Sequence, residues 1–424
     1  MSIEYLPISE LFSFEKGQLQ STKCTPGEYD FITASNEWKT HNEYDHECEA
    51  LVFAAAASGS LGRTHYVNGK FISSDLCFIL TPKDEKKYPI NISFYHFVFN
   101  SLRSTLVAAT KSGTSKESIN QKNFKKYELP YFEIEQQNEW IERLINTQEK
   151  KELLSSELNH QTDLLKKLRQ RILQEAIEGK LTADWRAENP DVEPANALLE
   201  RIQAEKARLI EEGKLKKQKK LPPINADELP FDLPHGWIGT RVGNTTYSIV
   251  PNRDKPKTFT GNIPWVTISD IDDKSLSLSL SSGMGLSHEE TQKYNARIMP
   301  KGSVLTGCVG RFGIAAIIEQ PIVANQQLHC FVPFQNVEPK YIAYSVKAYK
   351  SYFENIAIQT TLKYVNKTKM ESMFIALPPL AEQKAIVAKV ETLLHLCDHL
   401  ETEINTNQKN AASLLQAVLR EAFS

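Results

Sequence analysis

The chain of 424 residues contains no apolar run approaching the roughly 20 residues that a membrane-spanning helix needs. Its start, Met1-Ser2-Ile3-Glu4-Tyr5, lacks the basic segment and apolar core of a secretory signal peptide. The six cysteines are scattered without a Cys-x-x-Cys pair, which is typical of free thiols in a reducing compartment. We therefore expect a cytoplasmic protein that makes no membrane contact.

Motifs that carry catalysis are also missing. The sequence has no Gly-x-x-x-x-Gly-Lys-Ser/Thr phosphate loop, and no Asn/Asp-Pro-Pro-aromatic motif of adenine methyltransferases. A nuclease-like pattern, Pro190-Asp191 followed by Glu212-Gly213-Lys214, surrounds an expected helix instead of the strands that such a metal site needs. His395 and His399 share a helix face, but the Glu that separates such histidines in zinc proteases is absent. We expect no catalytic residue, metal or cofactor in this chain.

An excess of positive charge is absent too. The formal net charge is −2, which argues against a simple polycationic nucleic-acid binder. It is compatible with basic residues gathered on one surface, and with large protein–protein contacts. The hydrophobic share of 41% and charged share of 24% are ordinary for a soluble chain long enough for two or three domains.

What the sequence does contain is an internal repeat. Gly59-Ser60-Leu61-Gly62-Arg63 recurs 248 positions later as Gly307-Cys308-Val309-Gly310-Arg311, and Thr114 to Asn120 recurs 246 positions later as Thr360 to Asn366. Each half then reaches a Leu-Pro pair, Leu129-Pro130 or Leu377-Pro378. Such a pair ends a globular region, because the residue before proline avoids helical geometry. We therefore predict two related, mixed α/β domains.

A long amphipathic helix is predicted after each Leu-Pro pair, since neither 136–178 nor 381–424 contains Pro or Gly. Apolar residues recur there at alternating spacings of four and three, which indicates a heptad seam. In the second helix the seam comprises Ile386, Val390, Leu393, Cys397, Leu400, Ile404, a polar Asn407, Ala411, Leu414 and Val418. The positions 246 earlier are Trp140, Leu144, Thr147, Lys151, Leu154, Leu158, a polar Gln161, Leu165, Leu168 and Ile172. We expect the two helices, each about 65 Å long at about 1.5 Å per residue, to pair antiparallel as a ruler between the domains.

The segment between the first helix and the second domain has no repeat partner. Residues 179–235 are predicted to hold a short helix from Pro194 to Glu212 and then a lysine cluster at 214–220. The cluster is either a phosphate contact or a solvated linker.

Together these residues resemble the specificity subunit of Type I restriction–modification systems, over essentially the whole chain. The resemblance rests on Leu-Pro-Pro-Leu-Ala-Glu-Gln at 377–383, Gly-Lys-Leu-Thr-Ala-Asp-Trp-Arg at 179–186, Leu-Pro-His-Gly-Trp at 233–237 and the duplicated Gly-x-x-Gly-Arg elements. It implies an α+β fold with target-recognition domains at 1–133 and 236–378, joined by antiparallel spacer helices at 134–178 and 379–424. The chain departs from a perfect duplication: its first domain lacks a Gly-Trp opening, and Glu135-Gln136-Gln137 matches Glu382-Gln383 only after a one-residue slip.

The resemblance also implies a function. Each domain would read one half of a bipartite, asymmetric site in double-stranded DNA, and the helices would set the gap between the halves. Two modification subunits that use S-adenosylmethionine to methylate adenine would bind this chain, and restriction subunits that use ATP and Mg would join them. The runner-up hypothesis is a scaffold that binds no DNA, and a third is a solitary nuclease or methylase.

Candidate DNA contacts lie in the repeated loops. Arg63 and Arg311 can reach phosphate or the O6/N7 edge of guanine, although a structural arginine in a tight turn would give the same pattern. The polar loop residues form a phosphate-contact set or a plain surface loop: Lys111, Ser112, Gly113, Thr114, Ser115, Lys116 and Asn120, then Gln359, Thr360, Thr361, Lys363 and Asn366. The amides of Asn325, Gln326 and Gln327 suit adenine or a hydrogen-bonded loop end, and Asn252 and Arg253 form a further basic loop.

Overall fold

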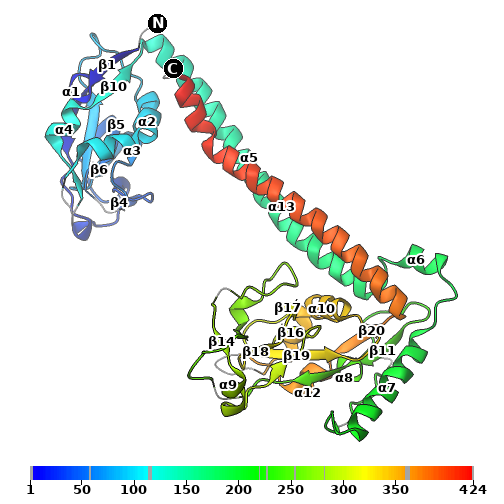
Figure 1. The fold of residues 1–424 in the computed structure, drawn as a ribbon. Helices are drawn as coiled ribbons and strands as arrows, with labels where there is room; N and C mark the ends of the chain where they lie inside the picture. Colours follow the sequence, from blue (N-terminus) through cyan, green and yellow to red (C-terminus); the bar gives the residue numbers. More distant parts are fainter. Residues whose placement is uncertain are drawn as a thin grey trace. The chain divides into compact units, whose positions relative to one another are not determined.

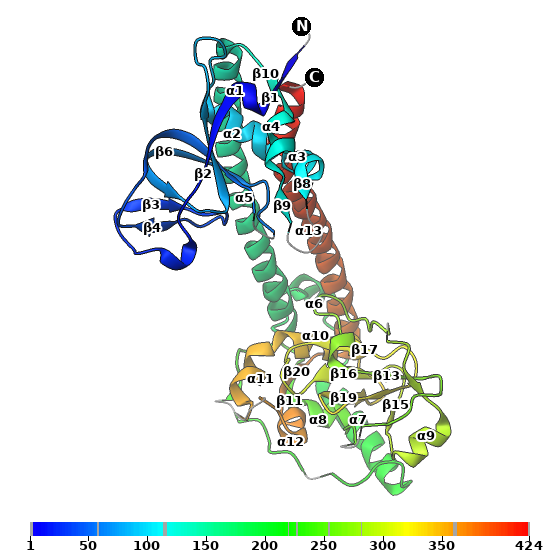
Figure 2. The same ribbon diagram turned by 90° about the vertical axis from the view of Figure 1, so that its left-hand side faces the viewer.

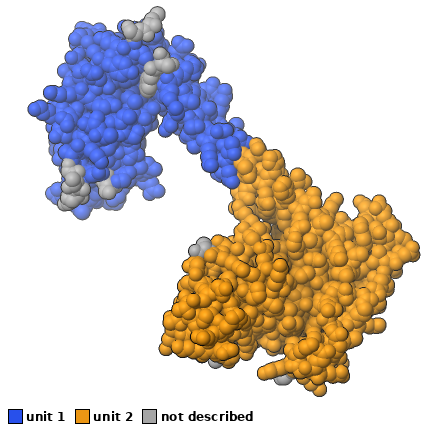
Figure 3. All heavy atoms as spheres, in the orientation of Figure 1, with its two compact units in different colours: residues 1–161, 404–424 blue, residues 162–403 orange. Residues whose placement is uncertain are grey.

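The computed structural model describes residues 3–56, 59–112, 117–218, 220–225, 228–252, 255–280, 282–358 and 363–422. Among these residues, no helix combines the length and apolar character needed to cross a membrane. The chain divides into two compact units (Figure 3): unit 1 is Met1–Gln161 with Ile404–Ser424, and unit 2 is Thr162–Glu403. Two long helices, α5 (Ile134–Ile177) and α13 (Leu380–Ala422), each contribute one part to each unit.

The main sheet of unit 1 has the strand order β2-β7-β5-β6-β3-β4. Its strands are β2 (Phe12–Lys16), β3 (Tyr29–Ile32), β4 (Lys39–His41), β5 (His46–Ala54), β6 (Thr64–Ser73) and β7 (Cys77–Pro82). β3 runs parallel to β6 and the other pairs are antiparallel. Shorter pairs join β1 (Glu4–Pro7) to β10 (Glu128–Tyr131), and β8 (Lys111–Ser112) to β9 (Ser118–Ile119). In Figure 2, β3 and β4 are seen beside β6.

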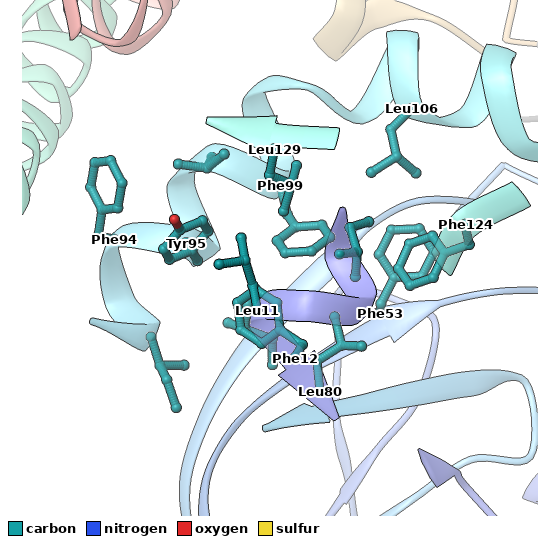
Figure 4. Packing of buried hydrophobic residues seen from close by; sticks show 14 of the residues in the cluster. Leu11, Phe12, Phe53, Leu80, Phe94, Tyr95, Phe99, Leu106, Phe124 and Leu129 are labelled. Carbon is teal, nitrogen blue, oxygen red and sulfur yellow. The ribbon is translucent and has the colours of Figure 1, made fainter. Parts of the chain in front are cut away.

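The core of unit 1 lies between this sheet and four helices. They are α1 (Ile8–Leu11), α2 (Ile92–Ser101), α3 (Arg103–Thr110) and α4 (Gln121–Lys126). Because side chains alternate along a strand, β5 directs Leu51 and Phe53 into this helical face and Val52 into a smaller cluster on the other face. Figure 4 shows Phe53 against Phe124, with ring centroids 4.6 Å apart. Burial on both faces explains why the second half of β5 is an apolar run.

Unit 2 carries two sheets, with strand orders β12-β19-β16-β17 and β14-β13-β18-β15. The strands are β12 (Thr246–Ile249), β13 (Ile263–Val266), β14 (Gly285–Leu286), β15 (Ile298–Met299), β16 (Val304–Gly307), β17 (Ala315–Ile317), β18 (Ile322–Ala324) and β19 (Leu328–Pro333). A separate pair joins β11 (Ile238–Arg241) to β20 (Phe374–Leu377). The helices are α6 (Ala183–Glu188), α7 (Ala195–Glu211), α8 (Val242–Thr245), α9 (His288–Lys293), α10 (Pro339–Ala348), α11 (Lys350–Ile356) and α12 (Lys367–Glu371). α7 confirms the short helix predicted between Pro194 and Glu212.

The two units share one framework, as the repeat predicts. β2 pairs with β7 as β12 pairs with β19, and β3 lies parallel to β6 as β13 lies parallel to β18. Gln137 accepts a hydrogen bond from the Asn91 N–H at 2.8 Å, and Gln383 accepts one from the Glu338 N–H at 2.9 Å. Because Gln137 and Gln383 are equivalent, Glu382 corresponds to Gln136, and the predicted one-residue slip is wrong.

The repeated glycine loops align differently from the sequence match. Gly59 and Gly62 have φ values of +78°, and Gly310 and Gly313 have +77° and +67°. A Cβ at Gly62 would meet Arg103 and Val107 of α3, and one at Gly313 would meet Lys350, the first residue of α11. Gly59–Gly62 therefore corresponds to Gly310–Gly313, and the pairing with Gly307–Gly310 is wrong by three residues. The sequence match is misleading because Gly307, Gly310 and Gly313 give the same Gly-x-x-Gly spacing in two frames. Arg63 therefore aligns with Ile314, and Arg311 with Ser60.

The long helices pack against each other antiparallel within each unit. In unit 1, Arg143 pairs with Glu421 at 3.0 Å, and Gln408 donates to Asn159 at 3.4 Å. In unit 2, Arg169 pairs with Asp398 at 2.7 Å and Glu401 at 3.2 Å. The antiparallel pairing predicted from the heptads is thus confirmed.

The seam between the helices is partly different from the prediction. Leu144, Leu158, Leu165 and Ile172 of α5 and Val390, Cys397 and Ala411 of α13 are buried as expected. The intervening leucines are not: Leu154, Leu168, Leu400 and Leu414 are 37–48% exposed. The predicted polar seam positions, Gln161 and Asn407, are exposed as well. Partly buried side chains one position later take their place, among them Ser155, Arg169, Glu401 and Leu415, so the contact is more polar than a leucine seam.

Candidate nucleic-acid interface

In unit 2, several loops that hold predicted DNA contacts meet at one edge of the sheets. The Asn325 N–H donates to the Val266 carbonyl at 2.9 Å, and the Cys308 N–H donates to the Gln327 carbonyl at 2.8 Å. The Gly310 N–H donates to the Lys363 carbonyl at 2.9 Å. These bonds join residues 266–268, 308–313, 325–327 and 363–365, which we call the unit 2 loop cluster.

Unit 1 has an equivalent arrangement. The Ser74 N–H donates to the Ile32 carbonyl at 2.9 Å, and the Ala55 N–H donates to the Leu76 carbonyl at 2.9 Å. The Ile119 N–H donates to the Ala55 carbonyl at 2.8 Å. Residues 32–34, 55–56, 59–63, 74–76, 110–112 and 118–120 form the unit 1 loop cluster.

Arg63 and Arg311 occupy these clusters in different ways. Arg63 donates through Nη1 to the Ala34 carbonyl and the Ser60 hydroxyl, both at 3.2 Å. Arg311 donates through Nη1 to the Ile268 carbonyl at 2.9 Å, and its Nη2 pairs with Asp273 at 2.6 Å. A guanidinium has five N–H donors, so each arginine can anchor a loop and still bind an anion.

Asn120 and Asn366 have a structural task that explains their repetition. Asn120 caps α4 by accepting from the Lys122 and Asn123 N–H groups at 3.0 and 3.1 Å. Asn366 caps α12 by accepting from the Lys369 N–H at 3.0 Å. Side-chain oxygens of this kind satisfy the unpaired N–H groups at a helix start. The side-chain carbonyl oxygens of Asn120 and Asn366 therefore stabilise the starts of α4 and α12.

The remaining predicted contacts lie in loops and in β8, at exposed or partly buried positions. The Asn325 amide donates to Gln327 Oε1 at 3.0 Å, which orders the turn and leaves Gln326 on the surface. Lys111 pairs with Glu117 at 3.1 Å, and the Ser112 hydroxyl donates to the Ser118 carbonyl at 3.4 Å. Asn252 lies away from the loop cluster and donates to the Tyr294 carbonyl at 3.4 Å. Outside the described residues are Gly113, Thr114, Ser115, Lys116, Lys219, Arg253, Gln359, Thr360 and Thr361.

A buried carboxylate in unit 2 joins the three motifs at 179–186, 233–237 and 377–383. The sequence alone predicts no contact between these motifs. Glu382, 1% exposed, accepts from the Thr182 hydroxyl at 2.8 Å and from the Arg186 guanidinium at 2.8 and 3.1 Å. Its other oxygen accepts from the Trp237 indole N–H at 2.8 Å. Buried charges persist when they are paired and hydrogen-bonded, so this carboxylate can hold the three motifs together.

The described residues contain no group of three His, Cys, Asp or Glu side chains placed to hold a metal ion. His329 is fully enclosed, and burial lowers its pKa to about 3, so its ring is neutral and bonds the Ser248 hydroxyl at 2.9 Å. Burial raises the pKa of the Cys77, Cys308 and Cys330 thiols to about 12. These groups serve packing, because thiols of high pKa are poor nucleophiles.

A family model described as "Type I restriction modification DNA specificity domain" matches residues 2–161 and again 249–408. The Escherichia coli EcoAI specificity subunit is 32% identical over 272 residues, and EcoEI is 27% identical over 274. Those matches cover 60% and 61% of this chain but only 44% and 45% of the relatives, so the chain matches less than half their length. The Salmonella potsdam StySPI specificity subunit is 34% identical over 99% of this chain and 82% of that protein.

Solved structures agree on the fold. The HsdS subunit from Thermoanaerobacter tengcongensis aligns with a TM-score of 0.59 over 100% of this chain and 96% of its own, at 16% identity. A chain from a structure titled for the assembly and conformational transition of the type I R-M system aligns with a TM-score of 0.60 over 100% and 97%, also at 16% identity.

Proposed function

Because the chain belongs to the family of Type I restriction–modification specificity subunits, we propose that it selects DNA sequences, with one loop cluster reading each half of a bipartite, asymmetric site. The observation that carries this proposal is the pair of loop clusters. They stand on one repeated framework but present different side chains, such as Arg311 where unit 1 has Ser60. A shared scaffold with divergent loops is suited to two different half-sites.

The catalytic steps then belong to partner subunits. Two modification subunits carrying S-adenosylmethionine would methylate adenine at the selected sites, and restriction subunits using ATP and Mg would cleave DNA. This chain would place them without a catalytic residue of its own. The carboxylate Glu382 supports such a role, since it fixes residues 179–186 and 233–237 to the start of α13 and gives the partners a defined surface.

The paired helices would set the gap between the half-sites. α5 and α13 run without interruption from one unit to the other, and an α-helix rises about 1.5 Å per residue. Adding a turn to both helices should therefore lengthen the gap and leave both half-sites unchanged.

Duplex binding by the chain together with its modification subunits tests the proposal. Retention of DNA should fall steeply as salt rises, because phosphate contacts release counterions. A competing duplex of unrelated sequence should displace the specific duplex poorly. Failure to bind any duplex in the presence of modification subunits would reject DNA selection and favour a scaffold that binds protein alone.

A further inference from the structure

Unit 1 has an open hollow of about 390 Å³ beside the long helix. It is lined by Trp38, Tyr66, Ser93, Phe97 and two histidines on the domain side, and by Ile141, Ile145 and Gln148 of α5. A second hollow continues from it, sharing His96, Phe97 and Gln148 and adding Asn100 and Ser155. Figure 1 shows α2 on the side of the domain that faces α5.

The same place in unit 2 is filled by the chain itself. Residues 270–280, which follow β13, lie against β17, α10 and α13. The Ile317 N–H donates to the Leu276 carbonyl at 2.8 Å. Lys347 Nζ of α10 donates to the carbonyls of Asp273 and Ser275 at 2.8 and 3.0 Å, and Lys274 pairs with Glu401 of α13 at 2.6 Å.

The three anchors of this loop have counterparts in the hollows of unit 1. Strand register places Tyr66 at the position of Ile317, because Thr64 pairs with Phe53 as Ala315 pairs with Thr306. The matching helices place Asn100 at the position of Lys347, and Ser155 at that of Glu401. Tyr66, Asn100 and Ser155 all line the hollows.

Within its described residues, unit 1 has no equivalent connection long enough to follow this path. Its connection between β3 and β4 spans only residues 33–38, whereas the connection between β13 and β14 spans 267–284. The two equivalent helices differ in burial as a result. Every residue from Tyr341 to Ala348 of α10 is buried, but His96 and Phe97 of α2 remain partly exposed. The repeat thus contains one filled and one open copy of the same groove.

We propose that the open groove of unit 1 receives an extended segment of the modification subunit, along the path that residues 270–280 follow in unit 2. This inference rests on the proposed function for the presence of that partner. The lining defines the chemistry of the segment. Neutral Asn100 and Ser155 replace the charged Lys347 and Glu401, and Ile145 is 47% exposed at the rim. Lys151 and Glu152 of α5 also line the second hollow.

Burial lowers the pKa of both His65 and His96 in the groove, which favours their neutral forms. The segment therefore carries aliphatic side chains that enter between Trp38 and Ile145, and polar side chains where Lys151 and Glu152 line the second hollow. Its main chain runs beside β6 as Leu276 runs beside β17.

Fluorine NMR of the full chain labelled with 5-fluorotryptophan tests the site. The chain has five tryptophans, and the Trp38 resonance is assigned with the Trp38→Phe variant. Adding purified modification subunit should shift the Trp38 resonance and leave that of Trp265, buried in unit 2, in place. A shift of Trp38 that depends on the concentration of the chain alone would indicate a second copy in the groove and overturn the proposal.

A matched pair of variants gives an independent readout. Ile145→Asp should weaken binding of the modification subunit at least tenfold, whereas Leu153→Asp, at a 74% exposed position on the same helix outside the hollows, should change it less than twofold. Circular dichroism melts of both variants should match the parent chain, since both side chains are exposed. A complex that forms normally with Ile145→Asp, with the Trp38 resonance unshifted, would overturn the groove and leave the proposed function intact. Absence of any complex and of DNA binding would reject both.

Discussion

Arg311 is held by an ion pair with Asp273, which a DNA phosphate or base would replace under the proposed function. Its partner Asp273 is 68% exposed, and the arginine itself is 38% exposed. Exposed pairs contribute only about 0–1 kcal/mol, so exchanging the carboxylate for a phosphate or a guanine edge costs little. Arg63 differs, because its Nη1 bonds a carbonyl and a hydroxyl within the unit 1 loop cluster.

Arg311→Gln should therefore weaken specific DNA binding by about 1–3 kcal/mol, or roughly tenfold or more. Asp273→Asn should strengthen it slightly by releasing the guanidinium. Lys301→Gln, at an exposed position of unit 2 outside the loop cluster, is the control. Titrations of labelled duplex with the complex measure all three, and an Arg311→Gln complex with parental affinity would remove this residue from the interface.

His329 makes the stability of unit 2 dependent on pH. Its pKa is about 3 in the folded chain and about 6.5 as a free side chain. The unfolded chain therefore binds a proton below pH 6.5 that the folded chain does not. The free energy of unfolding should fall by about 1.4 kcal/mol for each pH unit between about 6.5 and 3 from this residue.

In His329→Gln the dependence of the unfolding free energy on pH should be weaker, by the equivalent of about one proton taken up on unfolding. The Gln side chain can still reach Ser248 and does not titrate. Denaturant unfolding from pH 7.5 to 5.0 measures the difference. His65 and His96 also lower the unfolding free energy as the pH falls, because burial lowers the pKa of each. This contribution is the same in the parent chain and in the variant. An identical slope in parent and variant would show that His329 is protonated in the folded chain.

Among the larger elements, the start of α13 depends on one carboxylate. Glu382→Ala would leave the Arg186 charge and the Trp237 N–H without their acceptor. Breaking a buried ion pair costs about 3–5 kcal/mol. Its repeat counterpart Gln136 is exposed, so Gln136→Ala should change stability by less than about 0.5 kcal/mol. Equal effects in chemical unfolding would contradict the assignment of Glu382 as the joint of three segments.

The pairing of the long helices can be tested with leucines that the heptad pattern cannot tell apart. Leu158 and Leu165 are buried and Leu154 and Leu168 are exposed. Leu158→Ala should cost about 2–5 kcal/mol, and Leu154→Ala less than about 0.5 kcal/mol. Thermal unfolding of the two variants gives the comparison, and equal costs would restore the seam that the sequence predicts, in which both leucines are buried.

The sequence predicts the helices, their direction and the existence of a repeat, because periodicity and motif order survive divergence. It misses which leucines face the partner helix, since positions three and four after a buried residue both lie near the same stripe. It also misses the glycine register, because Gly-x-x-Gly occurs in two overlapping frames at 307–310 and 310–313, and the arginine follows the frame that is not equivalent. The candidate contacts were predicted only as loops. Their meeting at one edge depends on main-chain bonds such as that between Gly310 and Lys363, for which no sequence signal exists.

At the scale of the whole molecule, the two units differ where specificity would need them to differ. Unit 2 has residues 270–280 against its helices and Arg311 in its cluster, and unit 1 has neither. Under the proposed function, one framework would carry two readers with separate chemistry. Two unequal half-sites would be the consequence, and the continuous helices would give one fixed gap between them.

Mapping methylated adenines in the DNA of cells that express this chain with its modification subunits tests that claim most directly. The expected result is one asymmetric motif of two defined parts separated by a gap of constant length. A chain with one extra turn in both α5 and α13 should yield the same two parts with a longer gap. A contiguous or palindromic motif, or half-sites that change with helix length, would contradict the account of two readers on a shared framework.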